Sequence, residues 1–248
     1  MKIAISGKGG VGKTTLSSLL IYYLAGKGKK VIAVDADPDA NLALALGFHD
    51  LNIVPISEME SLIQERTGAK PGTSGSFFKI NPKVDDLPEK LWLEKGNIRL
   101  MVMGTVKKGG GGCICPESTL LKNLISHLVL YRDEVVILDM EAGIEHLGRA
   151  VASSVDILIV VVEPGKRSIE TAKTIKALAS DIGLNRIVVV GNKIRKKSDE
   201  DFIHENLGDM ELVGFLPFDE NLIESDMKGL PASEQYMERI QQLLERIS

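Results

Sequence analysis

Short apolar runs rich in valine, isoleucine and leucine alternate along this chain with longer segments of helical pattern. The runs lie at about residues 2–6, 30–34, 98–103, 134–139, 156–162, 186–191 and 211–215. Several of them, such as Ile157 to Val162, are apolar at every position, which is typical of strands covered by helices on both faces. The alternation predicts a three-layer α/β fold, with a mostly parallel sheet of about seven to eight strands flanked by helices.

The helical segments lie at about residues 14–26, 117–130, 145–152, 167–182 and 198–207, and a last helix is predicted at about 232–246. Residues 50–97 interrupt this rhythm because they contain no clear sheet strand, and they are predicted to be an insertion. Within them, Ser57 and Glu60 have the spacing of a capping box that opens a helix, which Gly68 is placed to end. The glycine-, proline- and serine-rich passage 71–88 is predicted to lie on the surface.

The first strand runs into a glycine-rich loop, residues 7–15, that reads Gly-Lys-Gly-Gly-Val-Gly-Lys-Thr-Thr. A loop of this spacing between a strand and a helix is a P-loop, whose backbone N–H groups and following helix N-terminus bind phosphate. Lys13 is predicted to reach the outer phosphates, and the Thr14 hydroxyl to hold Mg²⁺. The sequence thus predicts one P-loop NTPase domain over residues 1–248 that binds ATP or ADP with Mg²⁺. The expected nucleotide contacts in the loop are Gly9, Gly10, Val11, Gly12, Lys13, Thr14 and Thr15.

Acidic and amide side chains follow several other strands, at the edge of the sheet where ligands bind in this class of fold. Asp139 fits the carboxylate that holds Mg²⁺ through its water shell. Asp37 is predicted to position the water that attacks ATP, and Asp35 to support Asp37 or to replace it in that role. Asn192 and Lys193 follow a later strand, and the amide of Asn192 is expected to pair with the adenine edge through both its donor and its acceptor.

From Lys8 to Thr15 the chain resembles the deviant Walker A signature of the ATPase class that contains MinD, ParA and the nitrogenase iron protein. The Asp-x-Asp at 35–37, the run from Asp139 to Glu145 and the Asn-Lys at 192–193 are similar to further motifs of this class. The resemblance implies a nucleotide-sandwich dimer. In such a dimer Lys8 reaches the partner's nucleotide and supplies in trans the positive charge that an arginine finger gives elsewhere.

Two cysteines stand close together in the segment 109–116, which reads Gly-Gly-Gly-Gly-Cys-Ile-Cys-Pro. Pro116 suits the first position of a helix, so Cys115 is predicted to be the N-cap of that helix. The positive end of a helix stabilises a thiolate, and both Cys113 and Cys115 are therefore predicted to bind a soft metal ion, Ni²⁺ or Zn²⁺. A disulfide across a single intervening residue would be strained.

Two thiolates make only part of a tetrahedral metal site. His127 and His146 are histidines that could approach in space. The simplest completion is a second copy of the chain, which gives its own pair of cysteines at a two-fold axis. The trans lysine and the incomplete metal site thus point to the same homodimer, bridged by nucleotide and metal.

A further set of features resembles one subgroup, the CooC family of accessory ATPases. They are the Lys-Lys-Gly-Gly at 107–110, the Cys-x-Cys, the run 139–147, the Val-Glu-Pro at 162–164 and the Pro-Phe-Asp at 217–219. Members of this family help to load Ni²⁺ into apo carbon monoxide dehydrogenase, which carries an Fe–S cluster, and a close relative serves acetyl-CoA synthase. The resemblance implies a nickel metallochaperone with one of these enzymes as its client, and it adds Pro217 to the nucleotide contacts.

Composition narrows the class of partner. The net charge of −4 at pH 7 argues against a general nucleic-acid binder, which needs a basic surface. No stretch approaches the roughly 20 apolar residues that span a bilayer, and the chain starts directly with a core strand. We therefore expect a cytoplasmic protein that binds neither nucleic acid nor membrane and that has no structural disulfide.

Two other functions remain open on the sequence. Four thiolates at a dimer axis also suit a 4Fe–4S cluster, which would make the protein an electron donor or a cluster carrier. A positioning ATPase of the MinD type is the other alternative, and it calls for a membrane-binding amphipathic tail. Residues 233–248 are short of the aromatic and clustered basic residues that such a tail prefers.

Overall fold

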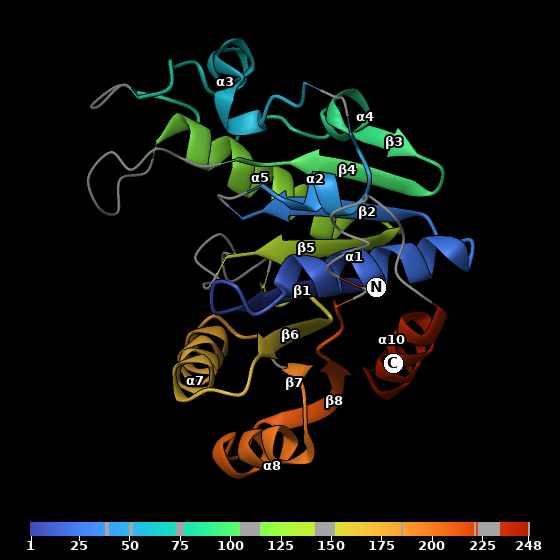
Figure 1. The fold of residues 1–248 in the computed structure, drawn as a ribbon. Helices are drawn as coiled ribbons and strands as arrows, with labels where there is room; N and C mark the ends of the chain where they lie inside the picture. The colour runs from blue at the N-terminus through green and yellow to red at the C-terminus, as the bar shows by residue number, and fades with distance from the viewer. Residues whose placement is uncertain are drawn as a thin grey trace.

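The computed structural model describes residues 1–37, 40–49, 52–72, 77–104, 115–141, 152–184, 186–220, 222 and 234–247. In this part of the chain, eight strands form one sheet in the order β3-β4-β2-β5-β1-β6-β7-β8. Neighbouring strands run parallel except β3, which pairs antiparallel with β4 at the edge of the sheet. Figure 1 shows the strands stacked through the molecule with helices around them. The predicted α/β fold with a mostly parallel sheet is confirmed.

The strands coincide with the predicted apolar runs to within a few residues, with β3 as the exception. They are β1 (Lys2–Gly7), β2 (Val31–Ala36), β3 (Leu93–Lys95), β4 (Ile98–Val102), β5 (Val135–Met140), β6 (Ile157–Val162), β7 (Ile187–Ile194) and β8 (Glu211–Pro217). Every residue of β1, β2, β5 and β6 is buried. These four strands therefore have the two covered faces that their continuous apolar runs indicated.

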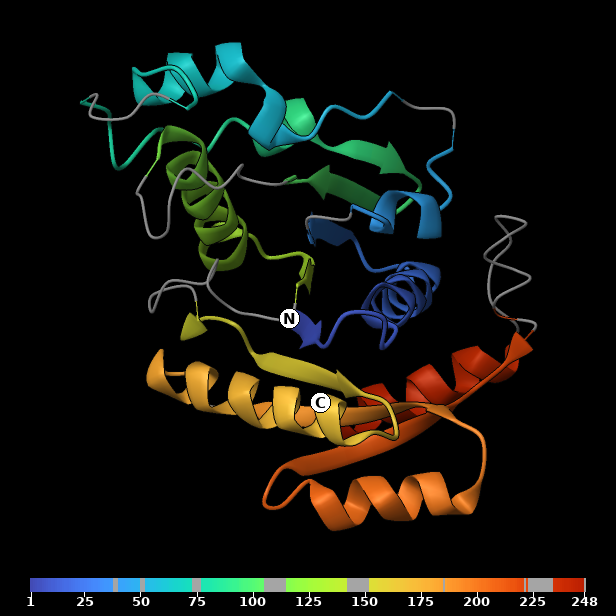
Figure 2. The ribbon, with the colours of Figure 1, turned by 60° about the vertical axis from the view of Figure 1, so that its left-hand side comes forward.

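Helices cover both faces of the sheet. The apolar core on one face contains α1 (Lys13–Gly26), α2 (Leu42–Ala45) and α10 (Glu234–Ile247). The core on the other face contains α3 (Glu60–Thr67), α5 (Pro116–Tyr131), α7 (Lys166–Asp181) and α8 (Lys197–Asn206). Figure 2 shows α1 and α5 on opposite sides of the strands. None of the described helices is both long and apolar enough to cross a membrane. The helix predicted at 145–152 lies outside the described residues except for Ala152.

The prediction that residues 50–97 contain no sheet strand is wrong. Leu93–Lys95 forms β3, which pairs antiparallel with β4 and extends the sheet at its edge. The two strands are joined by a turn in which Gly96 has a φ of 59°, a left-handed conformation that favours glycine. Only three residues pair, and Glu94 and Lys95 are exposed, so no apolar run marks this strand.

The predicted capping box is also wrong, although the helix that it was meant to open exists. Ser57 belongs to a short 3-10 helix, η1 (Ile56–Glu58), and α3 begins at Glu60 with Met59 as its N-cap and no side-chain cap. The end of the helix is as predicted, because Gly68 stops α3 in a left-handed conformation with a φ of 84°. A second short helix in this region is α4 (Pro88–Leu91).

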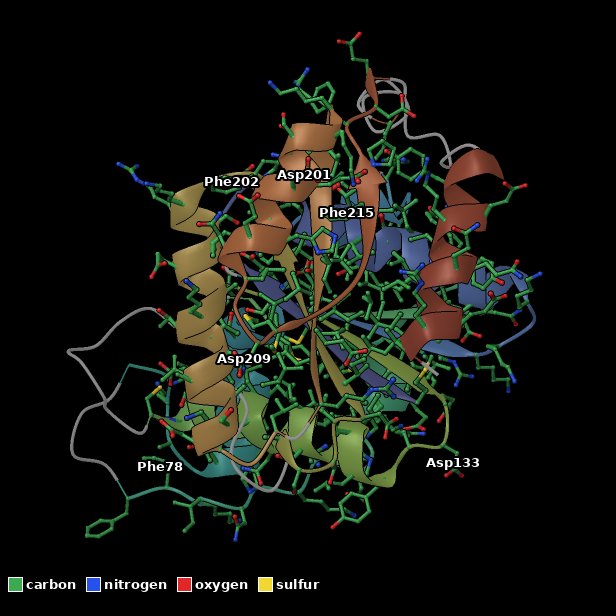
Figure 3. All side chains as sticks on the ribbon, turned by 90° about the horizontal axis from the view of Figure 1, so that it is seen from below. Phe78, Asp133, Asp201, Phe202, Asp209 and Phe215 are labelled. Atoms are coloured by element: carbon green, nitrogen blue, oxygen red, sulfur yellow. The ribbon has the colours of Figure 1, made fainter. Side chains whose placement is uncertain are left out.

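A glycine in β7 lets an aromatic residue of β8 pack closely against it. A Cβ on Gly191 would lie 2.4 Å from the ring of Phe215. The ring of His204 in α8 packs edge-on against the same phenylalanine, with centroids 5.5 Å apart. Figure 3 labels Phe215 of β8, the edge strand of the sheet, and Phe202 of α8. Gly191 directly precedes Asn192, a residue of the site described next.

Candidate functional site

The P-loop, residues 7–15, follows β1 at the edge of the sheet where the parallel strands end, and glycines set its shape. Gly7, Gly10 and Gly12 have positive φ angles of 150°, 80° and 98°. A Cβ on Gly7 would lie 2.4 Å from the carbonyl oxygen of Val161, and one on Gly12 would lie 2.3 Å from the side-chain nitrogen of Asn192. The loop therefore closes onto β6 and β7 only because these positions have no side chain. Such a cradle of backbone leaves N–H groups available to an anion.

Asn192 holds the P-loop from the end of β7. Its side-chain nitrogen donates a hydrogen bond of 2.8 Å to the carbonyl of Val11, and its side-chain oxygen accepts one of 2.8 Å from the N–H of Lys193. The residue is buried, with 8% of its surface exposed. One amide hydrogen and one lone pair are left beyond these two bonds. The adenine contact proposed for Asn192 stays a prediction, and the structure gives this residue a positioning role for the loop.

Two of the predicted catalytic side chains meet in the site. Lys13 Nζ lies 3.5 Å from Asp37 Oδ2, and the two side chains are 7% and 16% exposed. Asp37 follows β2, and its N–H donates a hydrogen bond of 3.4 Å to Asp35. The lysine that is expected to bind phosphate is thus paired with the carboxylate that is expected to position water.

Asp139, at the end of β5, is fully buried. Its Oδ1 accepts a hydrogen bond of 3.1 Å from the Ser17 hydroxyl, and the Thr14 hydroxyl donates to the same carboxylate. Burial raises the pKa of Asp139 to about 6, although the two hydroxyls and Lys13 act in the opposite direction. Its Oδ2 is buried without a hydrogen-bond partner. A hard cation or one of its water ligands beside Thr14 would supply that partner, so these residues fit Mg²⁺.

Asp35 lies in register with Asp139 on the neighbouring strand and is also fully buried. Its Oδ2 accepts a hydrogen bond of 3.0 Å from the N–H of Leu42, and its Oδ1 accepts the one from Asp37. Burial raises the pKa of Asp35 to about 7, and the nearby carboxylate of Asp139 adds to the rise. Both oxygens are engaged by the backbone that follows β2. This geometry suits the supporting role predicted for Asp35 better than the role of water ligand.

Lys8 contacts a residue whose part in the site the sequence did not indicate. Its Nζ lies 3.4 Å from Oε1 of Glu163, the residue that follows β6. Lys193 Nζ lies 3.4 Å from Oε2 of the same carboxylate and donates a hydrogen bond of 2.5 Å to the carbonyl of Gly10. Glu163 stood in the sequence only as part of the Val-Glu-Pro motif. Its role depends on contacts between three different strand ends, which a single sequence does not reveal.

Pro217 ends β8 next to the end of β7. It lies in register with Ile194, and the N–H of Phe218 donates a hydrogen bond of 2.9 Å to the Ile194 carbonyl. The guanidinium of Arg195 stacks over the ring of Phe218 at 3.6 Å from its centroid. These residues continue the edge that carries Asn192, so the position of Pro217 is compatible with its predicted nucleotide contact. The cation–aromatic pair was not predicted, and an arginine and a phenylalanine after adjacent strands were its only signal.

Of the two predicted metal-binding cysteines, Cys113 lies outside the described residues. Cys115 is the N-cap of α5, with Pro116 at the first helical position, as predicted. The prediction that the helix end stabilises its thiolate is wrong for this structure, because burial raises the pKa of the Cys115 thiol above its ordinary value and the charge of Glu117 adds to the effect. Loss of water around the sulfur outweighs the hydrogen bonds from Ser118, which lower the pKa.

The predicted histidine alternative is not assembled within one chain. His127 lies on α5 about 18 Å from the N-cap along the helix axis, at 1.5 Å per residue, where its ring packs on Tyr131. His146 lies outside the described residues. In the part of the chain that the structure describes, no group of three or more histidine, cysteine, aspartate or glutamate side chains is arranged to hold a metal ion.

Comparison with known proteins places these features in a family. The family model of the CobQ/CobB/MinD/ParA nucleotide-binding domain matches residues 2–232. An uncharacterised ATP-binding protein of Methanocaldococcus jannaschii is 54% identical over 234 residues, covering 93% of this chain and 90% of that protein. The carbon monoxide dehydrogenase accessory protein CooC of Rhodospirillum rubrum is 46% identical over 233 residues, covering 93% of this chain and 88% of that protein.

Solved structures agree on the fold. The cell division ATPase MinD of Pyrococcus furiosus superposes with a TM-score of 0.68 at 24% sequence identity, covering 100% of this chain and 98% of the other. At this level of identity the likeness supports the arrangement of strands and helices, and nothing finer.

Proposed function

This chain belongs to the CobQ/CobB/MinD/ParA family of nucleotide-binding ATPases, and from that premise we propose that it is a nickel metallochaperone that matures carbon monoxide dehydrogenase. ATP would draw two chains into a dimer, and the dimer would carry Ni²⁺ to the active-site cluster of the client enzyme. The observation that carries the proposal is the 46% identity with a carbon monoxide dehydrogenase accessory protein over 93% of this chain.

The residues of the described site suit ATP hydrolysis. Lys13, which lies 3.5 Å from Asp37, exchanges this partner for the phosphates when ATP binds in the P-loop. The exchange removes the cation from the carboxylate of Asp37, which then orients the attacking water. Thr14 and the buried Asp139 would hold Mg²⁺, which would neutralise charge on the phosphates.

The second chain would complete what one chain leaves unfinished. Lys8 would stabilise charge on the partner's nucleotide, and Cys113 and Cys115 of both chains would surround a single Ni²⁺, the cargo. Because burial raises the pKa of Cys115, metal binding would displace the proton of its thiol, so loading would release protons. Hydrolysis would separate the two cysteine pairs and lower their affinity for the metal.

The packing of α10 supports this proposal over the membrane-positioning alternative. The apolar residues of α10 are buried in the core that contains α1, and Tyr236 of this helix donates a hydrogen bond of 2.7 Å to the carbonyl of Pro217. The buried apolar residues are Tyr236, Ile240, Leu243, Leu244 and Ile247. In the described part of this helix the apolar side chains therefore pack on the fold, whereas insertion into a bilayer would need them exposed.

The proposal is tested by nickel content and native mass of the full chain, with ADP and with a non-hydrolysable ATP analogue. We expect a single Ni²⁺ for each pair of chains with the analogue, weaker binding with ADP, and no bound nickel in the Cys113→Ser/Cys115→Ser variant. Equal affinity in the two nucleotide states would contradict the coupling. Iron and sulfide bound instead of nickel after anaerobic purification would favour the Fe–S alternative. Activation assays with apo carbon monoxide dehydrogenase and apo acetyl-CoA synthase identify the client.

A further inference from the structure

The carboxylate of Glu163 contacts two lysines beside the P-loop. Glu163 follows β6, which pairs with β1 so that Val161 is in register with Gly7. Its Oε1 lies 3.4 Å from Nζ of Lys8, which comes directly after β1, and its Oε2 lies 3.4 Å from Nζ of Lys193 in β7. The carboxylate therefore bridges lysines that reach it from two neighbouring strands.

The backbone under this bridge is fixed on both sides. The N–H of Glu163 donates a hydrogen bond of 3.1 Å to the hydroxyl of Ser168, a residue of α7 with 2% of its surface exposed. Lys193 is the non-glycine residue with a positive φ, 59°, among the described residues. Such a conformation is uncommon for lysine and persists where surrounding contacts impose it. The bridge to Glu163 and the bond to the Gly10 carbonyl are those contacts.

Two carboxylates beside the P-loop, those of Asp37 and Glu163, pair with different lysines. Asp37 pairs with Lys13, which is expected to bind the nucleotide of its own chain, whereas Glu163 pairs with Lys8 and Lys193. Nucleotide bound in the same chain competes with Asp37 for Lys13. The corresponding competitor for Lys8 is the nucleotide of a second chain, because Lys8 is the residue proposed to act in trans.

We propose that Glu163 is a positioning residue that keeps Lys8 on its own chain until the nucleotide of a second chain takes it over. The inference rests on the proposed function, because it assumes that Lys8 acts across a dimer. The side chains of Lys8 and Glu163 are 38% and 27% exposed, and exposed ion pairs of this length are weak. Glu163 therefore sets a threshold for dimerisation and does not block it.

The threshold has a predictable size. A chain whose Lys8 is held in this way is not competent to pair, and because both chains of a dimer must be competent, the apparent dissociation constant rises by the inverse square of the competent fraction. For a pair of this strength the factor is about two- to fivefold for each chain, and therefore about four- to 25-fold for the dimer. Loss of the carboxylate lowers the protein concentration needed for dimerisation by that factor.

The test compares Glu163→Gln with a matched control, Glu170→Gln. Glu170 lies on α7, is exposed and pairs with Lys173 at 3.2 Å, so its substitution removes the same charge and one ion pair outside the site. Sedimentation with a non-hydrolysable ATP analogue is expected to show tighter dimers, by about four- to 25-fold, for Glu163→Gln alone. The ATPase rate of Glu163→Gln is expected to reach its plateau at a correspondingly lower protein concentration.

A second measurement reads the contact without a dimer. Acylation of lysines in the nucleotide-free protein, followed by peptide mass spectrometry, reports how firmly each amine is held. We expect Glu163→Gln to speed the labelling of Lys8 and to leave Lys173 unchanged, and Glu170→Gln to do the reverse. Unchanged labelling of Lys8, or weaker dimers in Glu163→Gln, would overturn the inference. A wild-type chain that stays monomeric with every nucleotide would instead overturn the proposed function, and the release of Lys8 in trans with it.

Discussion

Replacement of Gly12 by alanine tests whether close contact with Asn192 shapes the P-loop. Gly12 has a φ of 98°, and a Cβ there would lie 2.3 Å from the Asn192 side-chain nitrogen, which donates the 2.8 Å bond to Val11. An L residue held in this left-handed conformation costs about 1–2 kcal/mol. Loss of the buried hydrogen bond adds about 1–3 kcal/mol. The expected loss in the free energy of unfolding is therefore about 2–5 kcal/mol. This is a large part of the total free energy of unfolding of a typical protein, which is about 5–15 kcal/mol.

The matched control is Gly9→Ala in the same loop. A Cβ on Gly9 meets nothing within 4 Å, and its φ is not in the left-handed region. Both substitutions restrict the unfolded chain equally, so their difference isolates the folded state. In urea unfolding of the nucleotide-free protein we expect Gly9→Ala to match the wild type to within about 1 kcal/mol. Gly12→Ala should also melt at least about 4 °C lower.

A double variant distinguishes backbone strain at position 12 from the steric clash with the Asn192 side chain. In Gly12→Ala/Asn192→Ala the colliding amide is gone. The double variant should therefore lose less stability than the two single variants lose together, by about 1 kcal/mol or more. If Gly12→Ala were as stable as Gly9→Ala, the account of how β7 shapes the loop would be refuted. Additive losses in the double variant would leave only backbone strain as the cause.

Three further predictions follow from the buried carboxylates and the thiol. The pKa of Asp35 is raised from 3.8 to about 7 in the folded protein, so the folded state favours the protonated form. The stability that this gives is present at low pH and is lost as the pH rises from about 4 through 7. The loss is at most about 4 kcal/mol. Urea unfolding at pH 5 and pH 8 should show a flatter pH dependence for Asp35→Asn than for the wild type, and an identical slope would contradict the assignment. For Asp139→Asn, calorimetry should show that Mg²⁺ no longer strengthens ADP binding, whereas affinity in the presence of a chelator is kept; an unchanged effect of Mg²⁺ would mean that Asp139 does not hold the ion. Because burial raises the pKa of Cys115, iodoacetamide should modify it more slowly at neutral pH than a small-molecule thiol, as followed by peptide mass spectrometry, and faster reaction would show a stabilised thiolate.

The sequence predicted those parts of the fold that depend on local pattern. The strands that hold the P-loop, Asp37 and Asp139 are buried on both faces. Such strands are apolar at successive positions, and this pattern can be recognised in the sequence. β3 was missed because its three residues carry only Leu93 as an apolar side chain, with Glu94 and Lys95 exposed at the edge of the sheet. A strand so short and so exposed resembles a loop.

The missed features of the site depend on residues far apart in the chain. The contact of Asn192 with Val11 joins positions 181 residues apart, and that of Lys8 with Glu163 joins positions 155 residues apart. Motif spacing says which strand ends carry polar residues, but only the sheet order decides which of them touch. The error at Cys115 has the same origin, because the helix N-terminus can be predicted locally whereas the burial of the sulfur depends on how α5 packs.

The most direct test of the central claim, that one chain is catalytically incomplete, is a complementation assay. The variants Lys8→Ala and Asp37→Asn should each have little ATPase activity alone, since one lacks the trans lysine and the other the residue that positions water. In a mixed dimer, one site combines Lys13 and Asp37 of the Lys8→Ala chain with Lys8 of the Asp37→Asn chain. With random pairing, an equimolar mixture should therefore regain about a quarter of the wild-type rate. A mixture that stays inactive, or a Lys8→Ala variant that is fully active by itself, would contradict the account.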